Sequence, residues 1–199
     1  MIKGQSTASL ILDVALDLFS KHGFKSVSMD MIASKVGIKA PSLYKHFKNK
    51  DAIFNAILLK MENNDAQNAK EDNMPVESSL LNESSYQNVD VASLCSFSKN
   101  IFVYWTEDEF ASKFRRLLIH EQDSSEKIRT LLNQYLLTGP VDYLTDIFKN
   151  YKSLKDPKSF ALSFYSALFF LFSVYDQAEN KDEIKRMAFD KIDEMVKSI

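Results

Sequence analysis

Cysteine, histidine, glycine and proline are all scarce in this 199-residue chain, and each shortage excludes a class of protein. The single cysteine, Cys95, cannot form a disulfide within the chain or a multi-thiolate metal site. Four glycines and four prolines are too few for a turn-rich β protein. With only His22, His46 and His120, and without a glycine-rich phosphate loop, the sequence assembles no nucleophilic or metal site. We therefore expect neither enzymatic activity nor a bound metal or cofactor.

Long hydrophobic runs are missing too. The longest apolar stretch, Phe160–Tyr175, is interrupted only by serines and spans 16 residues, whereas a membrane helix needs roughly 20. The first residues, Met1–Gln5, lack the basic and then apolar pattern of a signal peptide. We expect a cytoplasmic protein in which the apolar stretch is a helix buried on most sides.

Net charge is distributed unevenly along the chain, although the total is only −2. Residues 1–60 hold nine lysines and four aspartates, a net charge of +5. Residues 61–199 hold 16 basic and 23 acidic groups, a net charge of −7. A small basic segment joined to a larger acidic one indicates that the first contacts a polyanion and the second does not.

Apolar residues recur with the period of an α-helix, and no segment alternates like a strand, so the predicted fold class is all-α. Residues 63–88 are polar and lose this period, which predicts a loop or weak helix and a domain boundary between 1–62 and 63–199. Thr138-Gly139-Pro140 predicts a break between two helices, because proline cannot continue a helical ladder. The predicted helices span residues 8–21, 28–36, 41–47, 91–105, 110–121, 126–137, 141–151, 158–178 and 181–198, and a further helix starts near residue 49 and continues past residue 61.

Residues 32–47 have the pattern of two short helices that meet at a steep angle. Ala33 is small enough for the helix axes to approach, and Gly37 suits the positive φ of a tight turn between them. The residues predicted to fill the space between these helices and the first helix are Ile32, Val36, Ile38, Leu43 and Phe47.

The second of these helices has a polar face. Ser42, Lys45 and His46 lie at positions i, i+3 and i+4, and such a face reaches phosphates and base edges in the major groove of DNA. Taken alone, the pattern also fits a helical hairpin with a solvated basic face.

Residues 8–58 resemble the DNA-binding domain of tetracycline-repressor (TetR) family regulators over the whole length of that domain. The resemblance implies an N-terminal three-helix domain with a helix-turn-helix that binds DNA, followed by a larger helical domain for ligand binding and dimerisation. The positions in register are Ile11, Ala15, Leu18, Phe19, Gly23, Ile32, Ala33, Val36, Gly37, Ile38, Leu43, Tyr44, His46, Phe47, Lys50 and Phe54.

The resemblance also implies roles for individual residues. Tyr44 is expected to contact a phosphate or a thymine methyl group, and Lys50 to meet the DNA backbone beside a helix N-terminus. Ser28 is expected to cap a helix and to contact phosphate. His46 is expected to pack beneath the recognition helix and donate to a phosphate; a buried, purely structural histidine is the alternative. The predicted DNA-binding set is Ser28, Lys39, Pro41, Ser42, Tyr44, Lys45, His46, Lys48 and Lys50.

Two departures from the family pattern leave the operator sequence open. Lys39 stands where the family often has serine or threonine, and Pro41 where it often has glycine or alanine. For Lys45 and Lys48, simple solvated charges are the alternative to DNA contacts.

The C-terminal part resembles the family less specifically. Two neighbouring apolar stripes run along residues 158–178, so one can face the core of the chain and the other a partner. Residues 181–198 would complete a four-helix interface of a homodimer, as in the family. The predicted dimerisation residues are Phe160, Phe164, Leu168, Leu171, Tyr175, Met187 and Met195.

Aromatic residues concentrated between 90 and 178 predict a cavity for a small, largely apolar ligand, with core packing as the alternative for each of them. The predicted ligand-binding residues are Trp105, Phe114, His120, Tyr143 and Tyr165. Together these features predict a repressor that leaves a palindromic double-stranded operator when a small apolar or aromatic molecule binds. A helical interaction module, or an activator that works through a protein partner, is the alternative.

Overall fold

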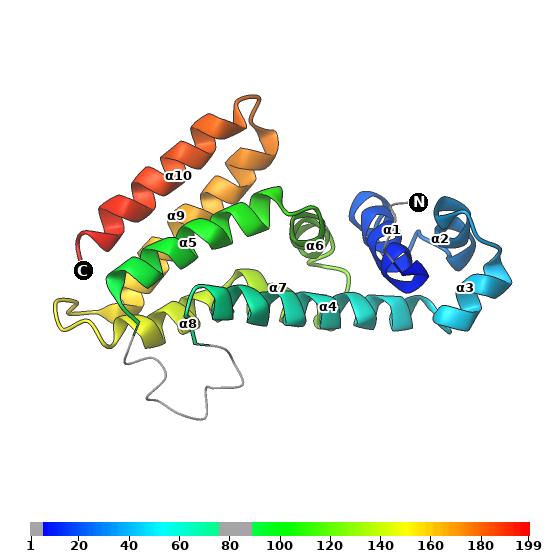
Figure 1. Ribbon diagram of the computed structural model, residues 1–199, viewed down its shortest axis with the longest axis horizontal. Coiled ribbons are helices and arrows are strands. Elements are labelled where there is room, and N and C mark those ends of the chain that lie inside the picture. The colour runs from blue at the N-terminus through cyan, green and yellow to red at the C-terminus, as the bar shows by residue number, and fades with distance from the viewer. Residues whose placement is uncertain (1–5, 76–88) are drawn as a thin grey trace. The chain divides into compact units, whose positions relative to one another are not determined.

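The computed structural model describes residues 6–75 and 89–199, and all regular structure in those ranges is α-helical (Figure 1). The predicted all-α class is confirmed. Met1–Gln5, and residues 76–88 of the predicted loop, lie outside the described residues. The helices are α1 (Thr7–His22), α2 (Met29–Val36), α3 (Ala40–His46), α4 (Lys50–Glu71), α5 (Val91–Glu107), α6 (Glu109–His120), α7 (Glu126–Leu136), α8 (Thr138–Phe148), α9 (Pro157–Gln177) and α10 (Lys181–Val196).

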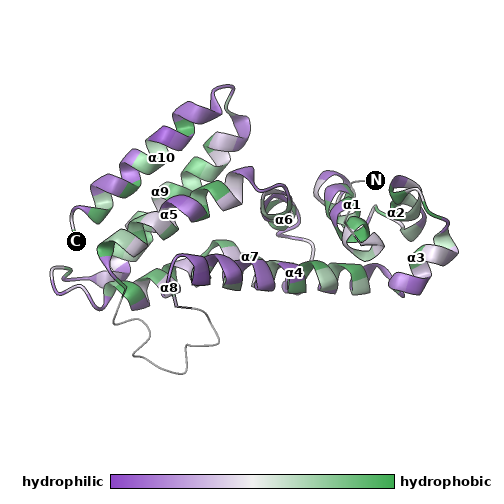
Figure 2. Cartoon of the chain, in the orientation of Figure 1, coloured by the Kyte–Doolittle hydropathy of each residue, from purple (hydrophilic) through white to green (hydrophobic). Residues whose placement is uncertain are grey.

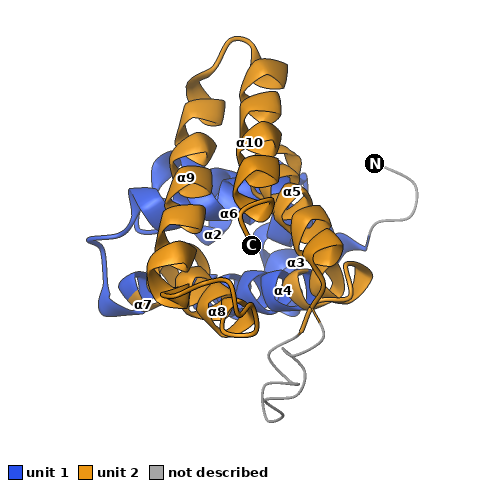
Figure 3. Ribbon diagram, turned by 90° about the vertical axis from the view of Figure 1, so that its left-hand side faces the viewer, with its two compact units in different colours: residues 1–64, 109–129 blue, residues 65–108, 130–199 orange. Residues whose placement is uncertain are grey.

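The chain packs as two compact units (Figure 3). The first unit holds the residues up to 64 together with residues 109–129, and the second holds residues 65–108 and 130–199. Helix α6 therefore packs with the N-terminal helices, although the sequence placed it in the second domain. The division of function between 1–62 and 63–199 stays a prediction.

Short-range signals begin and end the helices of the first unit as predicted. The side chain of Ser6 accepts a hydrogen bond from the backbone N–H of Ser9, and Ser28 accepts one from Met31, each at 3.2 Å. Gly37 has φ 81°, a left-handed conformation that favours glycine, and its N–H donates to the Ala33 carbonyl and so closes α2.

The core of the first unit is made from one face of each helix. Ile11, Phe19, Ile32 and Leu43 are fully buried, and each burial contributes about 1.5–3 kcal/mol of transfer free energy. Among the predicted residues between α2 and α3, Ile32 and Leu43 are buried, and the remaining three are half-buried: Val36, Ile38 and Phe47.

Helix α4 continues past Met61, as predicted, and extends to Glu71 within the polar segment that was predicted to be a loop or weak helix. The polar end of α4 is visible in its hydropathy colouring (Figure 2). Gln67 donates to Glu71 one helical turn further on, at 2.7 Å, and such i, i+4 pairs support a polar helix. Asn73, at φ 56°, ends the helix in a left-handed conformation, and the Met74 N–H donates to the Ala69 carbonyl at 2.7 Å.

The second unit is organised around α9, which packs against α5, α8 and α10. Its buried face is largely aromatic. The ring of Phe164 lies 5.7 Å from that of Phe148 on α8, and the ring of Phe172 lies 5.6 Å from that of Phe102 on α5. Edge-to-face and tilted contacts of this kind stabilise a core beyond the area that they bury.

The predicted break between α7 and α8 is present at Leu137, and α8 begins at Thr138, three residues before its predicted start. Pro140 lies in the first turn of α8, where its missing N–H costs little. Gly139 lies against the Gln134 carbonyl so closely that a β-carbon would collide with it. The break therefore depends on the glycine as well as the proline.

Among the described residues, α9 alone is long and apolar enough by length and composition to cross a membrane, with a mean hydropathy of 1.3 over its best 18 residues. In the second unit, however, its residues Ala161, Phe164, Leu168 and Phe172 are buried against neighbouring helices. Only 39% of those 18 residues are buried, and Leu162 and Phe170 are exposed on another face, so the expectation of a helix buried on most sides is wrong.

Candidate functional site

Helix α3 separates its residues cleanly into a buried and an exposed side. Leu43 is fully buried, whereas Ser42, Tyr44, Lys45 and His46 are exposed, Tyr44 by 52%. Tyrosine is seldom left so open without a partner for its ring, since its burial is favourable. The exposed side offers hydroxyls, an imidazole and an ammonium group, which are donors suited to phosphates and base edges.

The flanks of α3 add exposed positive charge. Lys39 precedes the helix and Lys48 follows it, and both are exposed, as are Pro41 and Ser28. Because His46 is also exposed, the alternative of a buried structural histidine is wrong, and so is the packing role beneath the helix. Its donation to a phosphate stays a prediction.

Lys50 has a structural role that the sequence did not indicate. Its Nζ donates to the carbonyl of Phe24 at 2.6 Å and to that of Lys25 at 3.2 Å. The same ammonium lies 4.7 Å from the centre of the Phe24 ring, which packs against Phe19 and Phe54. Lys50 therefore holds the turn between α1 and α2 against the start of α4, and this leaves one of its three N–H groups for a phosphate.

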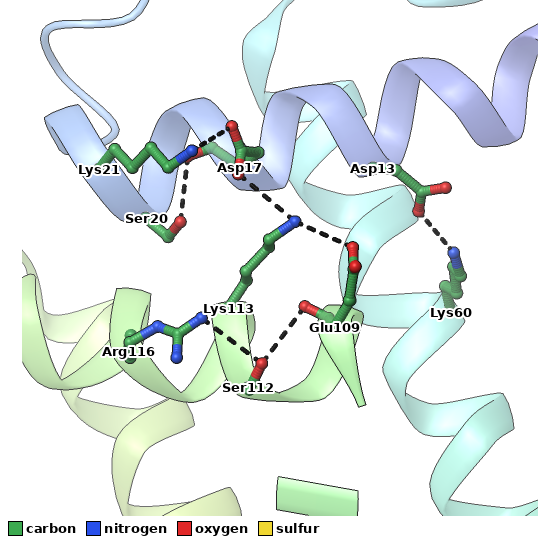
Figure 4. A network of polar contacts seen from close by, with 9 residues as sticks. All are labelled: Asp13, Asp17, Ser20, Lys21, Lys60, Glu109, Ser112, Lys113 and Arg116. Atoms are coloured by element: carbon green, nitrogen blue, oxygen red, sulfur yellow. Dashed lines mark hydrogen bonds and ion pairs between the residues drawn. The ribbon is translucent and has the colours of Figure 1, made fainter. Parts of the chain in front are cut away.

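A network of charged side chains links α1 to α6 within the first unit (Figure 4). Asp17 pairs with Lys21 at 2.9 Å and with Lys113 at 3.4 Å, and Lys113 also lies 3.4 Å from Glu109. Burial alone would raise the pKa of Asp17, but hydrogen bonds and the charges of the two lysines lower it below its ordinary value. Nearby, Lys60 on α4 pairs with Asp13 at 2.8 Å.

The predicted ligand-binding residues are not gathered inside one unit. Phe114 and His120 belong to the first unit, where Phe114 is fully buried and the His120 side chain is 66% exposed. Trp105, Tyr143 and Tyr165 belong to the second unit, where they take part in separate contacts. The ring of Trp105 lies 5.5 Å from that of Tyr104, the ring of Tyr143 6.1 Å from that of Phe97, and the ring of Tyr165 6.2 Å from that of Phe169.

Two of these tyrosines already use their hydroxyls. Tyr143 donates to the Pro75 carbonyl at 3.0 Å, and Tyr165 donates to the Leu136 carbonyl at 3.2 Å. Their hydroxyl protons therefore fix the path of the second unit's own backbone. Whether either ring contacts a ligand stays a prediction.

The second unit contains a different concave surface, a groove of about 560 Å³ between the end of α4 and α5. Four carboxylates and two amides dominate its lining, and none of the five predicted ligand-binding residues belongs to it. The groove could not be predicted because residues 63–72 carry no periodic signal. The lining residues are Asn68, Glu71, Asp72, Asn100, Ile101, Val103, Tyr104, Glu107 and Asp108.

The predicted dimerisation stripe on α9 requires a correction. Phe164, Leu168, Leu171 and Tyr175 are buried inside their own chain, so their side chains cannot form the surface of an interface. Tyr175 donates to Glu107 at 3.1 Å, and burial together with that carboxylate raises its pKa to about 12.

The apolar side chains that α9 leaves open belong to another face. Leu162 is 56% exposed and Phe170 is 66% exposed, while Phe160 and Met195 are half-buried. On α10, the predicted residue Met187 is 51% exposed. The second predicted stripe of α9 also faces the core, since Tyr165 and Phe172 are buried and Phe169 is half-buried. The prediction that one of the two stripes faces a partner is therefore wrong, because Leu162 and Phe170 belong to neither stripe.

Comparison with known proteins concerns first the N-terminal region. Residues 11–57 match the family described as "Bacterial regulatory proteins, tetR family". The chain is similar to the HTH-type transcriptional regulator AcrR of Shigella flexneri, with 42% identity over 62 residues. The match covers 31% of this chain and 29% of AcrR, so more than two thirds of each chain lie outside it.

Two solved structures share the fold over nearly the whole chain. One is the complex of SmeT, a repressor of Stenotrophomonas maltophilia, with triclosan; it has a TM-score of 0.69 at 20% identity and covers 98% of this chain and 91% of SmeT. The other is AibR in complex with isovaleryl coenzyme A and operator DNA, with a TM-score of 0.64 at 18% identity over 92% of this chain and 96% of AibR.

Proposed function

We propose that the chain is a dimeric repressor of the TetR family of bacterial regulatory proteins and that a small molecule releases it from a palindromic operator. The observation that carries the proposal is the exposed polar side of α3, with Leu43 buried beneath it. The left-handed turn at Gly37 holds this helix at an angle to α2, and a helix presented in this way fits the major groove.

The exposed residues divide into two kinds of contact. Ser42, Tyr44 and His46 stand on α3 itself and reach base edges and the adjacent phosphates. Lys45 and Lys48 supply positive charge, which neutralises phosphates without reading sequence. Lys39 and Pro41 at the helix start, Ser28 at the start of α2 and Lys50 at the start of α4 complete the proposed contact set.

A homodimer supplies the second recognition helix. Two half-sites of a palindrome lie roughly 34 Å apart, one turn of the double helix, and a two-fold dimer matches that spacing. Leu162 and Phe170 on α9, with Met187 on α10, offer exposed apolar surface for the partner. They replace the buried stripe that the sequence suggested.

Release by a ligand completes the proposal. Proteins of the same fold support it, since SmeT forms a complex with triclosan and AibR forms one with isovaleryl coenzyme A and operator DNA. Ligand and operator must then oppose each other reciprocally, with a coupling of about 1–3 kcal/mol as is typical of such systems. A repressor of this kind works in the cytoplasm, where its operator is.

DNA binding can be tested before the operator sequence has been identified. Immobilised protein is mixed with a pool of random DNA duplexes, and the retained duplexes are sequenced. We expect enrichment of a two-fold symmetric sequence with half-sites about ten base pairs apart. Tyr44→Ala should weaken its binding, whereas Leu59→Ala, at an exposed position of α4, should not. Retention of the pool without any enriched sequence would contradict the proposal.

A further inference from the structure

The acidic groove of the second unit has the size of a ligand site. Its volume of about 560 Å³ falls in the range of 300–1,000 Å³ that is typical of small-molecule pockets. One wall, from α5, carries Ile101, Val103 and Tyr104, which supply apolar and aromatic surface. The opposite wall is the polar end of α4, with Asn68 and Glu71.

Two of the four carboxylates of this groove, Glu71 and Asp72, accept hydrogen bonds from neutral side chains. Of its four carboxylates, Glu107 faces Lys185, whose Nζ lies 2.9 Å from it. Asp72 accepts neutral donors: the hydroxyl of Ser96 at 3.3 Å and the amide of Asn100 at 2.8 Å. Neutral donors orient a carboxylate without cancelling its charge, so the groove attracts a cation.

A second observation, independent of charge, also indicates a ligand site. Asn68 lines the groove, and its Nδ2 atom is buried and has no hydrogen-bond partner among the described residues. A buried amide N–H without an acceptor is costly and is rare in native proteins. The other side-chain amide of the groove, Asn100, is satisfied by both oxygens of Asp72. Asn68 therefore lacks an acceptor that a ligand would provide.

From these features we propose that the groove binds an amphiphilic organic cation that carries a hydrogen-bond acceptor, such as a carbonyl, next to an aromatic or alkyl group. The ammonium lies among Glu71, Asp72 and Glu107, the acceptor receives the Asn68 N–H, and the apolar part lies against Tyr104. This inference rests on the proposed function, because it names the ligand class of the repressor. It differs from the small, largely apolar ligand that the sequence suggested by requiring a positive charge.

The test uses the full-length protein and a matched pair of probes. The cationic probe is N-(5-aminopentyl)benzamide, and its neutral counterpart is N-pentylbenzamide, which has the same amide and ring without the ammonium. Calorimetric titration into DNA-free protein should show binding of the cation at least about ten times tighter than that of the neutral probe. Equal binding of the two probes, or no binding of the cation, would overturn the proposal.

Two variants in the groove, with one control outside it, distinguish binding at the groove from a general effect of the protein's net charge. Glu71→Gln should weaken binding of the cationic probe only about threefold, because the Glu71 carboxylate is exposed and its charge is partly screened by solvent. Glu62→Gln, on the same helix but outside the groove, should leave the affinity for the probe unchanged. Asn68→Ala should weaken the cation about fivefold and leave the thermal stability of the free protein unchanged or higher, because the Nδ2 atom makes no bond to lose. A loss of stability in this variant, or unchanged probe binding, would contradict the assigned role.

The outcome for the groove can be told apart from the outcome for the repressor. Operator retention is measured without probe, and probe binding is measured without DNA. If the protein retains an operator but does not bind the cation, the groove inference fails and the proposed function stands. If the cation binds with the expected pattern of variants while no operator is retained, the groove stands as a cation site and the repressor proposal fails.

Discussion

The two units of this chain leave very different side chains on their surfaces. The first exposes Tyr44, His46 and several lysines around α3, whereas the second exposes Phe170 and Leu162 on α9. The second also concentrates carboxylates in the groove beside α5. On the proposed function, the first surface binds phosphates, and the second binds the apolar face of a partner chain and an organic cation. The exposed side chains of each unit, rather than its helical core, therefore determine which partner it can bind.

The charge of each part of the sequence agrees with this difference. A net charge of +5 in residues 1–60 favours DNA, and a net charge of −7 in residues 61–199 disfavours it. A cation in the groove and DNA at α3 would therefore use opposite electrostatics. The two ligands need not compete for one surface, so their mutual effect has to be a coupling between sites.

The largest expected effect comes from the apolar face of α9. Replacing Leu162 and Phe170 together by arginine should raise the dissociation constant of the dimer at least about a hundredfold, because charged groups would enter a desolvated interface. Light scattering at micromolar concentration should then report a monomer. Both side chains are exposed within their own chain, so the helical circular dichroism spectrum should not change.

Two controls make the dimer prediction specific. Val91→Arg, at another exposed apolar position, should leave the dimer intact. Leu168→Ala removes a side chain that is buried within the chain, so it should lower the free energy of unfolding by about 2–5 kcal/mol. A dimer that survives both arginine substitutions would mean that the exposed face of α9 lies outside the interface.

Lys50 and Lys48 lie close together in the first unit's sequence but differ in their contacts. Lys50 donates hydrogen bonds to backbone carbonyls, whereas Lys48 is exposed. Lys50→Ala should lower the free energy of unfolding by about 2 kcal/mol, because two carbonyls lose a charged donor. Lys48→Ala should leave stability unchanged and flatten the log-log salt dependence of DNA binding by roughly 1 per lost phosphate contact. Urea denaturation and filter binding at several salt concentrations measure the two effects.

A stable Lys50→Ala protein would show that the lysine does not support the turn between α1 and α2. An unchanged salt slope in the Lys48→Ala protein would place Lys48 away from the DNA backbone and favour its alternative as a solvated charge.

The sequence predicted the first unit in more detail than the second for a physical reason. The caps at Ser6 and Ser28 and the turn at Gly37 depend on residues within four positions, so the local pattern contains the information. Lys50 shows the limit even there. Its ammonium reaches carbonyls about 25 residues away along the chain, and no local pattern marks such a contact.

In the second unit the helices were predictable but the roles of their faces were not. Helix α9 is apolar on most sides, and its inner face depends on α5, α8 and α10, which lie far away in sequence. Periodicity marked the buried stripes of α9 but not the exposed face that carries Leu162 and Phe170, because that face becomes distinct only when neighbouring helices cover the other sides. The groove was missed for a related reason, because Asn68 and Glu71 belong to a polar segment whose helical form depends on local side-chain pairs.

Substitution of Ser28 measures how much one helix cap stabilises the first unit. Ser28→Ala removes the acceptor for the Met31 N–H and should lower the free energy of unfolding by about 1 kcal/mol. Ser26→Ala, an exposed neighbour before the helix, should have no effect beyond about 0.5 kcal/mol. Urea denaturation compares the two variants, and Ser28→Asp should restore most of the loss. Equal stability of both alanine variants would mean that water replaces the cap without cost.

The smallest expected effect concerns the ion pairs between α1 and α6. The lysines hold the pKa of Asp17 below its ordinary value in the folded protein, so the folded state binds this proton less readily than the unfolded state. The resulting stability is fully present above the unfolded pKa of about 4 and is lost as the pH falls through the lower, folded pKa. Because the network is partly solvated, Asp17→Asn should lower the free energy of unfolding by only about 0.5 kcal/mol at pH 7.

The pH dependence distinguishes this electrostatic effect from a packing effect of the same size. The difference between wild type and Asp17→Asn should be constant from pH 8 to about pH 5 and should shrink at lower pH, where the wild-type carboxylate takes up its proton. Asp123→Asn, at an exposed position of the same unit, provides the matched loss of one charge and should change little at any pH. Because packing does not titrate, a difference that stays constant down to pH 3 would assign the role of Asp17 to contacts other than Lys21 and Lys113.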